Sequence, residues 1–578
     1  MLSVGSGVSA SLIRTNRRIM ENKSENRICQ NCKTSFVIEI DDFSFYEKMN
    51  VPAPVLCPNC RFKRRAIWRN ETTLYTGRKC AKCGKSIVSM YNPKSPYTVY
   101  CHECYNSDSW DPRDYAMDYN ESKPFFEQFG ELIKKVPKMT TYITTGLGPN
   151  VNSDYTNTAG GNKNCYMVFN SGLNENVLYS RGVTSCRDSL DMYFTTEIEL
   201  GYELVNTHKA SKIIWSKNNP ACLDCAFLLN CSGCTNCFGC VNLRNKSYHF
   251  FNQPLSKEEY QDKVNKIMGS YREMEKFRKE FEDFSLQFPR RENNNLKTVN
   301  CVGDYITEGK NLFNCFEVAE AEDCKNMFSA KKIKDSYDVI GHGYYSELLL
   351  ECNGTGISSR VIGSSNVENG NNLEYCYFLM PNNKYCFGCN SLRNAEYCIL
   401  NKQYTKESFD KLRTKIISEL KEKNLYGLFM PPELSPFAYN ETVAQDNMPL
   451  SKEEALKQGW RWEDNLQKTE GKETLKPEQI PDHIKDVQDG ITKEILVCIS
   501  CNRNYKIVPD ELLFYRKMNL PLPRKCFSCR HTDRIRRRGP MKFWTRHCAK
   551  CNKIITTTFA PDRPEIVYCE KCYQSEVV

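Results

Sequence analysis

Sixteen of the thirty-two cysteines in this 578-residue chain form Cys-x-x-Cys pairs, four pairs near each end. The pairs are Cys29/Cys32, Cys57/Cys60, Cys80/Cys83 and Cys101/Cys104, then Cys498/Cys501, Cys526/Cys529, Cys548/Cys551 and Cys569/Cys572. Two such turns separated by a hairpin bring four thiolates around one tetrahedral ion. The spacing therefore predicts two four-cysteine sites at each end and about four structural Zn²⁺ ions in the whole protein.

Metal binding is favoured over disulfide bonds, because residues 1–18 lack the continuous apolar run of a secretory signal. We therefore expect a cytoplasmic protein with reduced thiols and a tail over residues 1–25. No apolar run reaches the roughly 18–20 residues that cross a bilayer, so we expect no membrane partner. Sulfur fills all four positions of each predicted site and leaves none for a catalytic water, which predicts a non-enzymatic role.

The two cysteine-rich ends are copies of each other. Residues 45–52 (FYEKMNVP) match residues 514–521 (FYRKMNLP), and the cysteine pairs keep the same order and spacing to within one residue. Duplicated modules are therefore predicted at residues 26–112 and 493–578.

Each module carries a recognisable local pattern. The first combines Phe36-Val37, Phe45-Tyr46 and Cys57-Pro58 with its first two cysteine pairs, and this pattern resembles a family described only as probable zinc ribbon. The whole chain resembles uncharacterised multi-ribbon proteins of uncultivated bacteria, with residues 89–91 and 435–442 as further markers. The resemblance implies a zinc-ribbon fold and a bound metal, but no reaction. A helix that begins in the last knuckle would suit a treble-clef variant equally well.

Positive charge is concentrated in the two modules. The chain carries 80 basic and 70 acidic residues, and 18 of the basic against 8 of the acidic residues lie in 493–578. Arginines follow the second knuckle of each module at intervals of four: Arg61, Arg65 and Arg69, then Arg530, Arg534 and Arg538. On a helix these side chains share one face, and guanidinium groups pair well with phosphate. We expect contact with a nucleic-acid backbone, either RNA, as in the ribosome, or DNA. A solvated basic face and an acidic protein partner are the alternatives.

The middle of the chain predicts a mainly β fold. Short pieces bounded by Asn, Asp, Gly or Ser recur over residues 164–252 and 300–401, which is typical of a β-solenoid. We expect two short strands and about 22 residues in each coil. A β-sandwich is the alternative and would need strands of about 5–6 residues.

The predicted solenoid is itself duplicated. Residues 237–240 (CFGC) recur at 386–389, which predicts one copy at 164–295 and a second at 296–425, each followed by a helix. The first helix begins at the capping box Ser256-x-x-Glu259 and the second near Thr405. We expect these helices to cover the solenoid ends.

Six cysteines cluster in the first copy: Cys222, Cys225, Cys231, Cys234, Cys237 and Cys240. An iron–sulfur cluster would need a fourth ligand followed by proline, and the second copy places Met380 and Asn383 where the first has Cys231 and Cys234. We therefore interpret the six as stacked core thiols, with an additional zinc site or a redox site as alternatives. His208 and His342 could act as acid or base, but are interpreted as satisfied polar residues.

The remaining segments are predicted to connect these parts. Residues 113–163 should form a helix over 125–136 and a linker, and residues 426–492 a linker with a short helix from Ser451. The sequence thus predicts a zinc-binding, non-enzymatic protein that contacts nucleic acid through its modules and uses the solenoid as spacer and docking surface. A protein–protein scaffold is the first alternative, and a carbohydrate-active or redox solenoid the second.

Overall fold

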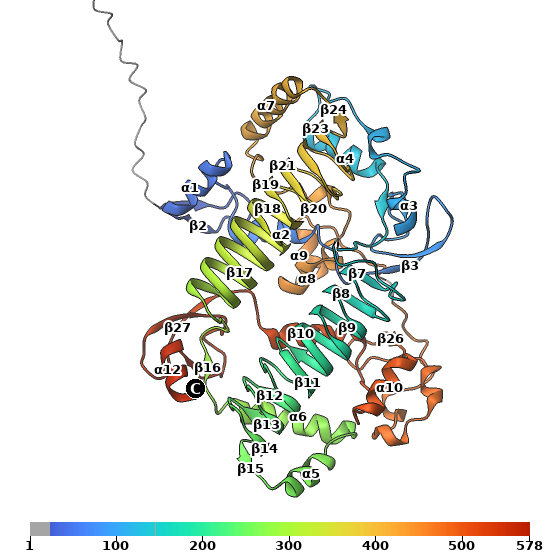
Figure 1. The fold of residues 1–578 in the computed structure, drawn as a ribbon, viewed down its shortest axis with the longest axis vertical. Helices are drawn as coiled ribbons and strands as arrows, with labels where there is room; N and C mark the ends of the chain where they lie inside the picture. Colours follow the sequence, from blue (N-terminus) through green and yellow to red (C-terminus); the bar gives the residue numbers. More distant parts are fainter. Residues whose placement is uncertain (1–23, 145, 467, 578) are drawn as a thin grey trace, which may run out of the picture.

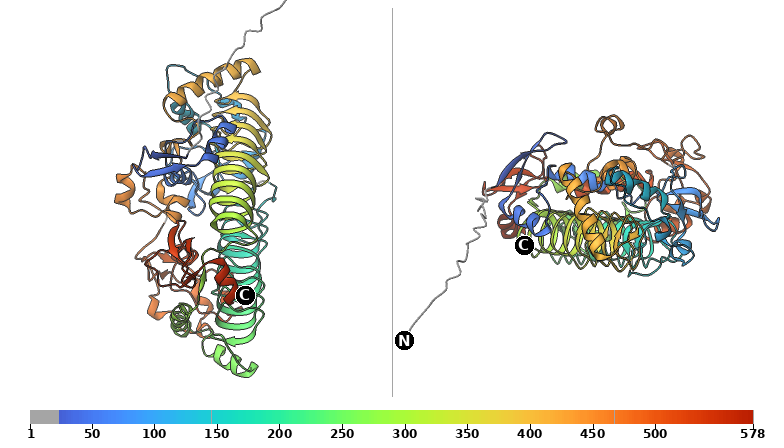
Figure 2. Two further views of the ribbon diagram at one scale, coloured as in Figure 1. Left: turned by 90° about the vertical axis from the view of Figure 1, so that its left-hand side faces the viewer. Right: turned by 90° about the horizontal axis from the view of Figure 1, so that it is seen from above.

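The computed structural model describes residues 24–144, 146–466 and 468–577, so most of the expected tail lies outside the described residues. Two β-solenoids lie side by side and run in opposite directions (Figure 1). Solenoid A comprises β7 to β15 and solenoid B comprises β17 to β24. The coils share one layer, and the cysteine-rich modules cover one face of that layer (Figure 2). The predicted fold class is confirmed: mainly β, with a duplicated solenoid between two cysteine-rich modules.

The strands of the solenoids are short segments of continuous coils. Those of solenoid A are β7 (Thr156–Gly160), β8 (Tyr166–Gly172), β9 (Glu175–Thr184), β10 (Arg187–Val205), β11 (His208–Ile214), β12 (Leu223–Leu229), β13 (Thr235–Val241), β14 (Ser247–Phe250) and β15 (Gln253–Pro254). Those of solenoid B are β17 (Val299–His342), β18 (Ser346–Gly356), β19 (Ser359–Ile362), β20 (Ser365–Glu368), β21 (Gly370–Glu374), β22 (Asn383–Phe387), β23 (Glu396–Ile399) and β24 (Lys402–Gln403).

Each coil contains 12 residues in most of the structure, because strand partners such as Leu223 and Thr235 are 12 positions apart. Every third residue from Asn164 to Phe251 has a positive φ, so each coil turns four corners. The prediction of about 22 residues per coil is therefore wrong. The backbone takes a left-handed conformation once in every three residues. Four short sides therefore close each coil in about half the predicted number of residues.

Each three-residue side has one inward, one outward and one corner position. The side chains that fill the interior of solenoid A all occupy the inward position, from Cys165 to Cys240 at intervals that are multiples of three. Asparagine tolerates the left-handed corner better than most residues, and its amide can pair with the next coil. Asn206, Asn218 and Asn230 form such a ladder, with Nδ2 to Oδ1 distances of 2.8 and 2.9 Å. This geometry explains why short Asn-bounded pieces recur in the sequence.

Small polar side chains at inward positions satisfy backbone groups of the coils. Ser216 Oγ donates to the carbonyl of Ile214 at 2.8 Å and accepts from the amide of Leu228 at 3.1 Å. Cys225 does the same, donating to the carbonyl of Leu223 at 3.2 Å and accepting from the amide of Cys237 at 3.4 Å. Serine and cysteine are therefore interchangeable in this position of the coil.

The cysteine-rich modules each contain two hairpins and several helices. The N-terminal module has β1 (Glu25–Ile28), β2 (Ser35–Ile38), α1 (Ile40–Met49), α2 (Pro58–Ala66), β3 (Tyr75–Lys79), β4 (Ser86–Ser89), β5 (Val99–Tyr100) and α3 (His102–Asn106). The C-terminal module has β25 (Leu496–Val497), β26 (Asn504–Tyr505), α10 (Pro509–Lys517), α11 (Phe527–Arg538), β27 (Trp544–His547), β28 (Ile554–Thr557), β29 (Val567–Tyr568) and α12 (Glu570–Val577).

Further elements connect these parts. They are α4 (Phe125–Lys135), β6 (Lys138–Met139), α5 (Lys257–Asn265), α6 (Tyr271–Ser285), β16 (Arg290–Arg291), α7 (Lys406–Glu422), α8 (Val443–Asn447) and α9 (Lys452–Lys457). The expected helices at 125–136, from the Ser256 capping box, near Thr405 and from Ser451 are all confirmed.

The C-terminal end of each solenoid is covered in the same way. The last coil strand pairs with a short antiparallel strand, β15 in solenoid A and β24 in solenoid B. A helix follows and packs an aromatic ring on the last coil, Tyr260 on Tyr248 and Phe409 on Tyr397. The prediction that these helices cover the solenoid ends is confirmed.

Two predicted boundaries are wrong. The solenoid starts before Asn164, because β7 already pairs with β8 and Val151 bridges to Lys163. Residues 426–492 are not only a linker, because several of their apolar side chains belong to the largest hydrophobic core: Phe429, Met430, Phe437, Tyr439, Val443 and Ala444. Neither boundary shows in local composition, because burial of these segments depends on distant partners.

We predict that Ser216→Ala destabilises the protein, whereas Ser216→Cys is tolerated. Alanine leaves the amide of Leu228 without its acceptor inside the solenoid, which costs about 1–3 kcal/mol of unfolding free energy. Cysteine keeps both contacts, as Cys225 shows. Urea unfolding of the two variants measures the difference, and equal losses for both would contradict this role of the inward position.

Candidate metal centres and the buried arginine rows

Four groups of cysteines bring four Sγ atoms together, all within 4.8 Å of one another in each group. They are Cys29, Cys32, Cys57 and Cys60; Cys80, Cys83, Cys101 and Cys104; Cys498, Cys501, Cys526 and Cys529; and Cys548, Cys551, Cys569 and Cys572. These are the sixteen cysteines and the four groupings expected from the spacing. Each group contains sulfur donors in the number that a tetrahedral ion requires, so each could hold one metal ion.

The four groups share one local architecture. The first cysteine pair of each group lies at the turn of a two-stranded hairpin, and the third cysteine directly precedes a helix. Cys57, Cys101 and Cys526 are the N-cap residues of α2, α3 and α11. A helix that begins in the second knuckle is the treble-clef arrangement named as an alternative to the ribbon.

Backbone amides favour the thiolate form in these groups. The amide of Cys101 donates to Cys80 Sγ at 3.3 Å, and that of Cys569 donates to Cys548 Sγ at 3.2 Å. Burial opposes ionisation of Cys80, but the amides of Cys83 and Cys101 outweigh it and lower the pKa to about 6. The same balance lowers the pKa of Cys548 to about 6. One sulfur atom in each of these two groups is therefore easy to deprotonate before a metal ion binds.

We predict that the purified full-length protein carries one metal ion per cysteine group, and that Cys57→Ser removes one of them. Serine is a poor replacement for a thiolate ligand, and a three-sulfur site holds the ion less tightly. Elemental analysis by mass spectrometry measures the metal content. Cys301→Ser is the matched control, because Cys301 lies in solenoid B outside the four groups; equal metal loss in both variants would contradict the assignment.

The second arginine row, on α11, is buried against solenoid A. Arg534 has no exposed surface, and its Nη1 lies 2.8 Å from Asp191 Oδ1 and 2.9 Å from Glu203 Oε1. Arg530 pairs with the same Asp191 at 3.1 Å and with Glu511 at 3.4 Å. The arginines of this row share one face of α11, as the sequence predicted, but that face points into the protein.

The first row is buried against solenoid B in the same way. Arg61 Nη2 lies 2.9 Å from Asp338 Oδ2, and Arg65 Nη1 lies 2.6 Å from Glu351 Oε2. Arg69 lies beyond the end of α2, so it is not on the helical face predicted for the row. It pairs with Glu71 and also reaches Asn353 at 3.3 Å.

The third arginine of each row reaches both solenoids. Arg69 contacts Asn353 of solenoid B and, at 3.3 Å, Asn170 of solenoid A. Arg538 lies 3.0 Å from the hydroxyl of Tyr193 in solenoid A and 3.5 Å from Glu317 in solenoid B. The rows therefore join the solenoids as well as docking the modules.

These contacts contradict the expectation that the six arginines line a phosphate-binding surface. Every one of them is buried, and carboxylates of the same chain occupy their guanidinium groups. Sequence inspection gave the spacing but could not give the partners, which are Glu71, Asp191, Glu203, Glu317, Asp338, Glu351 and Glu511. A buried charge needs such a partner, because desolvation of an unpaired ion is costly.

A single carboxylate connects the rows to the solenoid core. Glu71 is buried and receives Arg181 Nε at 2.5 Å as well as Arg69. Burial opposes its ionisation, but the guanidinium groups of Arg181 and Arg69 outweigh burial and lower the pKa of Glu71 to about 2. No sequence signal marked Glu71, since Arg181, its partner in solenoid A, is 110 residues away in the chain.

The six clustered cysteines of solenoid A are inward residues of two successive coils. Their thiols donate to backbone carbonyls, for example Cys231 to Cys240 at 3.4 Å and Cys240 to His249 at 3.5 Å. None of the six belongs to the compact sulfur groups found among the described residues. This arrangement agrees with the interpretation as stacked core thiols.

The two histidines considered as acid or base are both half-buried. Desolvation lowers the pKa of His208 to about 4, and its Nε2 lies 3.1 Å from the amide oxygen of Asn206. Desolvation also lowers the pKa of His342 to about 4. Both rings are therefore neutral near pH 7, and the polar partner of His208 is an amide.

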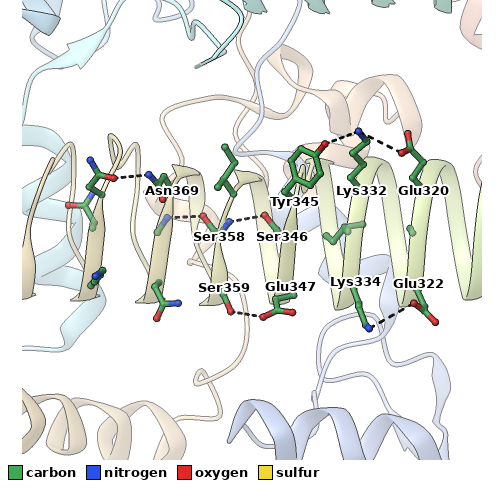
Figure 3. Close-up of a pocket in the computed structure, with 18 of the residues that line it drawn as sticks. Glu320, Glu322, Lys332, Lys334, Tyr345, Ser346, Glu347, Ser358, Ser359 and Asn369 are labelled. Carbon is green, nitrogen blue, oxygen red and sulfur yellow. Dashed lines mark hydrogen bonds and ion pairs between the residues drawn. The ribbon is translucent and has the colours of Figure 1, made fainter.

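An open groove runs along one side of solenoid B (Figure 3). It has a volume of about 1140 Å³ and spans eight successive coils, from Glu308 to Glu396. A row of corner side chains and a parallel row of outward side chains border a floor of inward residues such as Ser346 and Ser358. A smaller groove of about 840 Å³ lies on the corresponding side of solenoid A.

Charges of both signs alternate along the groove of solenoid B. Glu322 pairs with Lys310 at 2.6 Å and with Lys334 at 3.9 Å in the coil on its other side. Lys332 pairs with Glu320 and lies 4.8 Å from the centre of the Tyr345 ring. Tyr345 projects from this row and is largely exposed.

Comparison with known proteins adds little to this description. No protein-family model matches the chain, and no curated protein matches it. The chain is similar to a crystal structure from Desulfovibrio desulfuricans G20 that is provisionally described as an acetyltransferase, with 10% identity over 49% of this chain and 83% of that one. The TM-score is 0.10, so this likeness carries no argument. No helix in the described part of the chain is long and apolar enough to cross a membrane.

We predict that Arg534→Ala destabilises the protein by about 3–5 kcal/mol, because it leaves Asp191 and Glu203 buried with less positive charge. Arg536 is the matched control on the same helix, with a side chain that is 75% exposed. Arg536→Ala should change the unfolding free energy by less than about 0.5 kcal/mol. Urea unfolding measures both variants, and a small effect of Arg534→Ala would contradict the docking role.

Proposed function

We propose that this protein is a non-enzymatic, zinc-stabilised scaffold that binds a protein partner along the open side of its solenoids. In this proposal four Zn²⁺ ions fill the four cysteine groups and fold the modules, which hold the two solenoids side by side. The cytoplasm is the proposed compartment, because all thirty-two cysteines are free and metal–thiolate bonds persist where thiols stay reduced.

The observation that carries the proposal is the burial of both arginine rows. Guanidinium groups that dock the modules on carboxylates cannot also bind phosphate without unfolding that contact. The modules therefore dock on the solenoids of their own chain. The open, grooved side of the solenoids remains as the surface for a partner. Four sulfurs around each ion also leave no open position for a substrate or a catalytic water.

The charge of the groove favours a protein over a polyanion. Five acidic residues line it, Glu308, Glu320, Glu322, Glu347 and Glu396, together with four basic residues, Lys310, Lys332, Lys334 and Lys384. A nucleic-acid site would carry an excess of positive charge. Mixed charges with one exposed tyrosine suit a protein surface, where electrostatic complementarity sets the register and aromatic side chains add affinity.

We predict that proteins captured by the full-length chain from a nuclease-treated lysate of its source cells are lost with the groove variant Lys332→Glu/Lys334→Glu. Reversing two charges places two new carboxylates beside those of Glu320 and Glu322, and like charges across an interface repel the cognate surface. Quantitative mass spectrometry of the captured proteins provides the measurement. Lys257→Glu/Lys266→Glu on and after α5 is the matched control, with the same change of charge at exposed lysines far from the groove.

Binding to polyuridylate provides the opposing outcome. Strong binding by the full-length chain that falls steeply with salt would be the behaviour of a phosphate-binding surface and would contradict the proposal. Equal capture of proteins by the groove variant and the control would place the partner surface elsewhere and would also contradict it.

A further inference from the structure

Three of the four solenoid ends are covered by other parts of the chain. The two C-terminal ends carry the antiparallel strands and helices described above. The N-terminal end of solenoid A is bordered by the preceding segment, where Ile143 bridges to Ala159. At the N-terminal end of solenoid B, β17 is the last strand of its sheet, and no strand in the described part of the chain pairs with the outer side of its first coil.

The first coil of solenoid B also has an apolar rim. Leu296, Val299 and Val302 occupy outward positions on three successive sides of this coil, and Val299 is 65% exposed. The outward positions of later coils on the groove side carry charged residues instead. β16 precedes this coil and pairs with β29 of the C-terminal module, and neither strand buries these side chains.

An open coil of this kind is unstable as a free surface. Its outer backbone groups are available for strand pairing, and solenoid proteins normally cover such ends with polar caps, helices or charged edge residues. Lysine is the usual protective residue on an exposed edge. Lys297 is present in this coil, but it is turned to Glu308 in the next coil at 2.8 Å.

We propose that the first coil of solenoid B stacks on the same coil of a second copy of this chain, related by a two-fold axis. A two-fold axis presents the same open edge from both sides, so one contact covers both edges at once. The two-fold axis makes the facing strands antiparallel, unlike the parallel strands within the solenoid, and the apolar rims of both copies meet around the junction. Because the only cation of the rim is paired within its own copy, little charge repulsion opposes the contact.

Asn300 is a corner residue at the free edge of solenoid B. Its Nδ2 donates to Asn311 Oδ1 at 2.9 Å in the next coil, as in the other corner ladders. The ladder of this corner therefore begins at Asn300. A second copy extends the backbone pairing on this side of the coil.

The test is the mass of the full-length, metal-loaded protein in analytical ultracentrifugation as a function of concentration. We expect a reversible dimer of the natural chain and a monomer for Val299→Lys/Val302→Lys. Leu223→Lys is the matched control, since Leu223 is an exposed apolar residue, at 49%, on the side of solenoid A. It should dimerise like the natural chain.

Hydrogen exchange provides a second readout that does not depend on the variants. The amides of residues 297–302 should exchange more slowly at high protein concentration than at low concentration, because the dimer buries that edge. A natural chain that stays monomeric, or a dimer that survives the lysine substitutions with unchanged exchange, would overturn the proposal. Protection of the same amides by a different protein in place of a second copy would overturn it as well. The groove experiment is unaffected by any of these results, so the two proposals fail separately.

Discussion

Buried arginine–carboxylate pairs hold the four parts of this protein together. The N-terminal module docks on solenoid B through Arg61 and Arg65, and the C-terminal module docks on solenoid A through Arg530 and Arg534. Each module thus packs on the copy of the solenoid that is farther from it in sequence. Such pairs form only when all partners are in place, because a charge left alone in the interior is strongly destabilising.

This dependence connects the metal sites with the solenoids. The third cysteine of two groups, Cys57 and Cys526, is the N-cap residue of the helix that begins each arginine row. A metal ion that fixes the cysteine also fixes the start of the helix, and the helix sets the direction of the guanidinium groups. A metal ion in these two groups would therefore be structural in a specific sense: it would orient the side chains that join the solenoids.

The solenoids use a different principle, in which one position of every three has a fixed role. Inward serine, cysteine and asparagine all pair with backbone carbonyls and amides, as Ser216, Cys225 and Asn219 do. This equivalence explains why the second solenoid can have Asn383 where the first has Cys234, without any change of fold. It also explains how thirty-two cysteines divide between metal sites and core without a disulfide bond.

The sequence alone determined the features that depend on local spacing. The four groups of four cysteines, the duplication, the solenoid class and the helices at Ser256 and Thr405 all follow from residues close together in the chain. The 12-residue coil was not predicted, because its period of three lies in the backbone angle and several residue types satisfy each position. Only the tertiary structure decided that the arginine rows are buried, since Asp191 and Asp338 are hundreds of residues from the arginines they pair with. Charge in a sequence shows where a partner is needed, and the fold decides whether that partner is another molecule or the same chain.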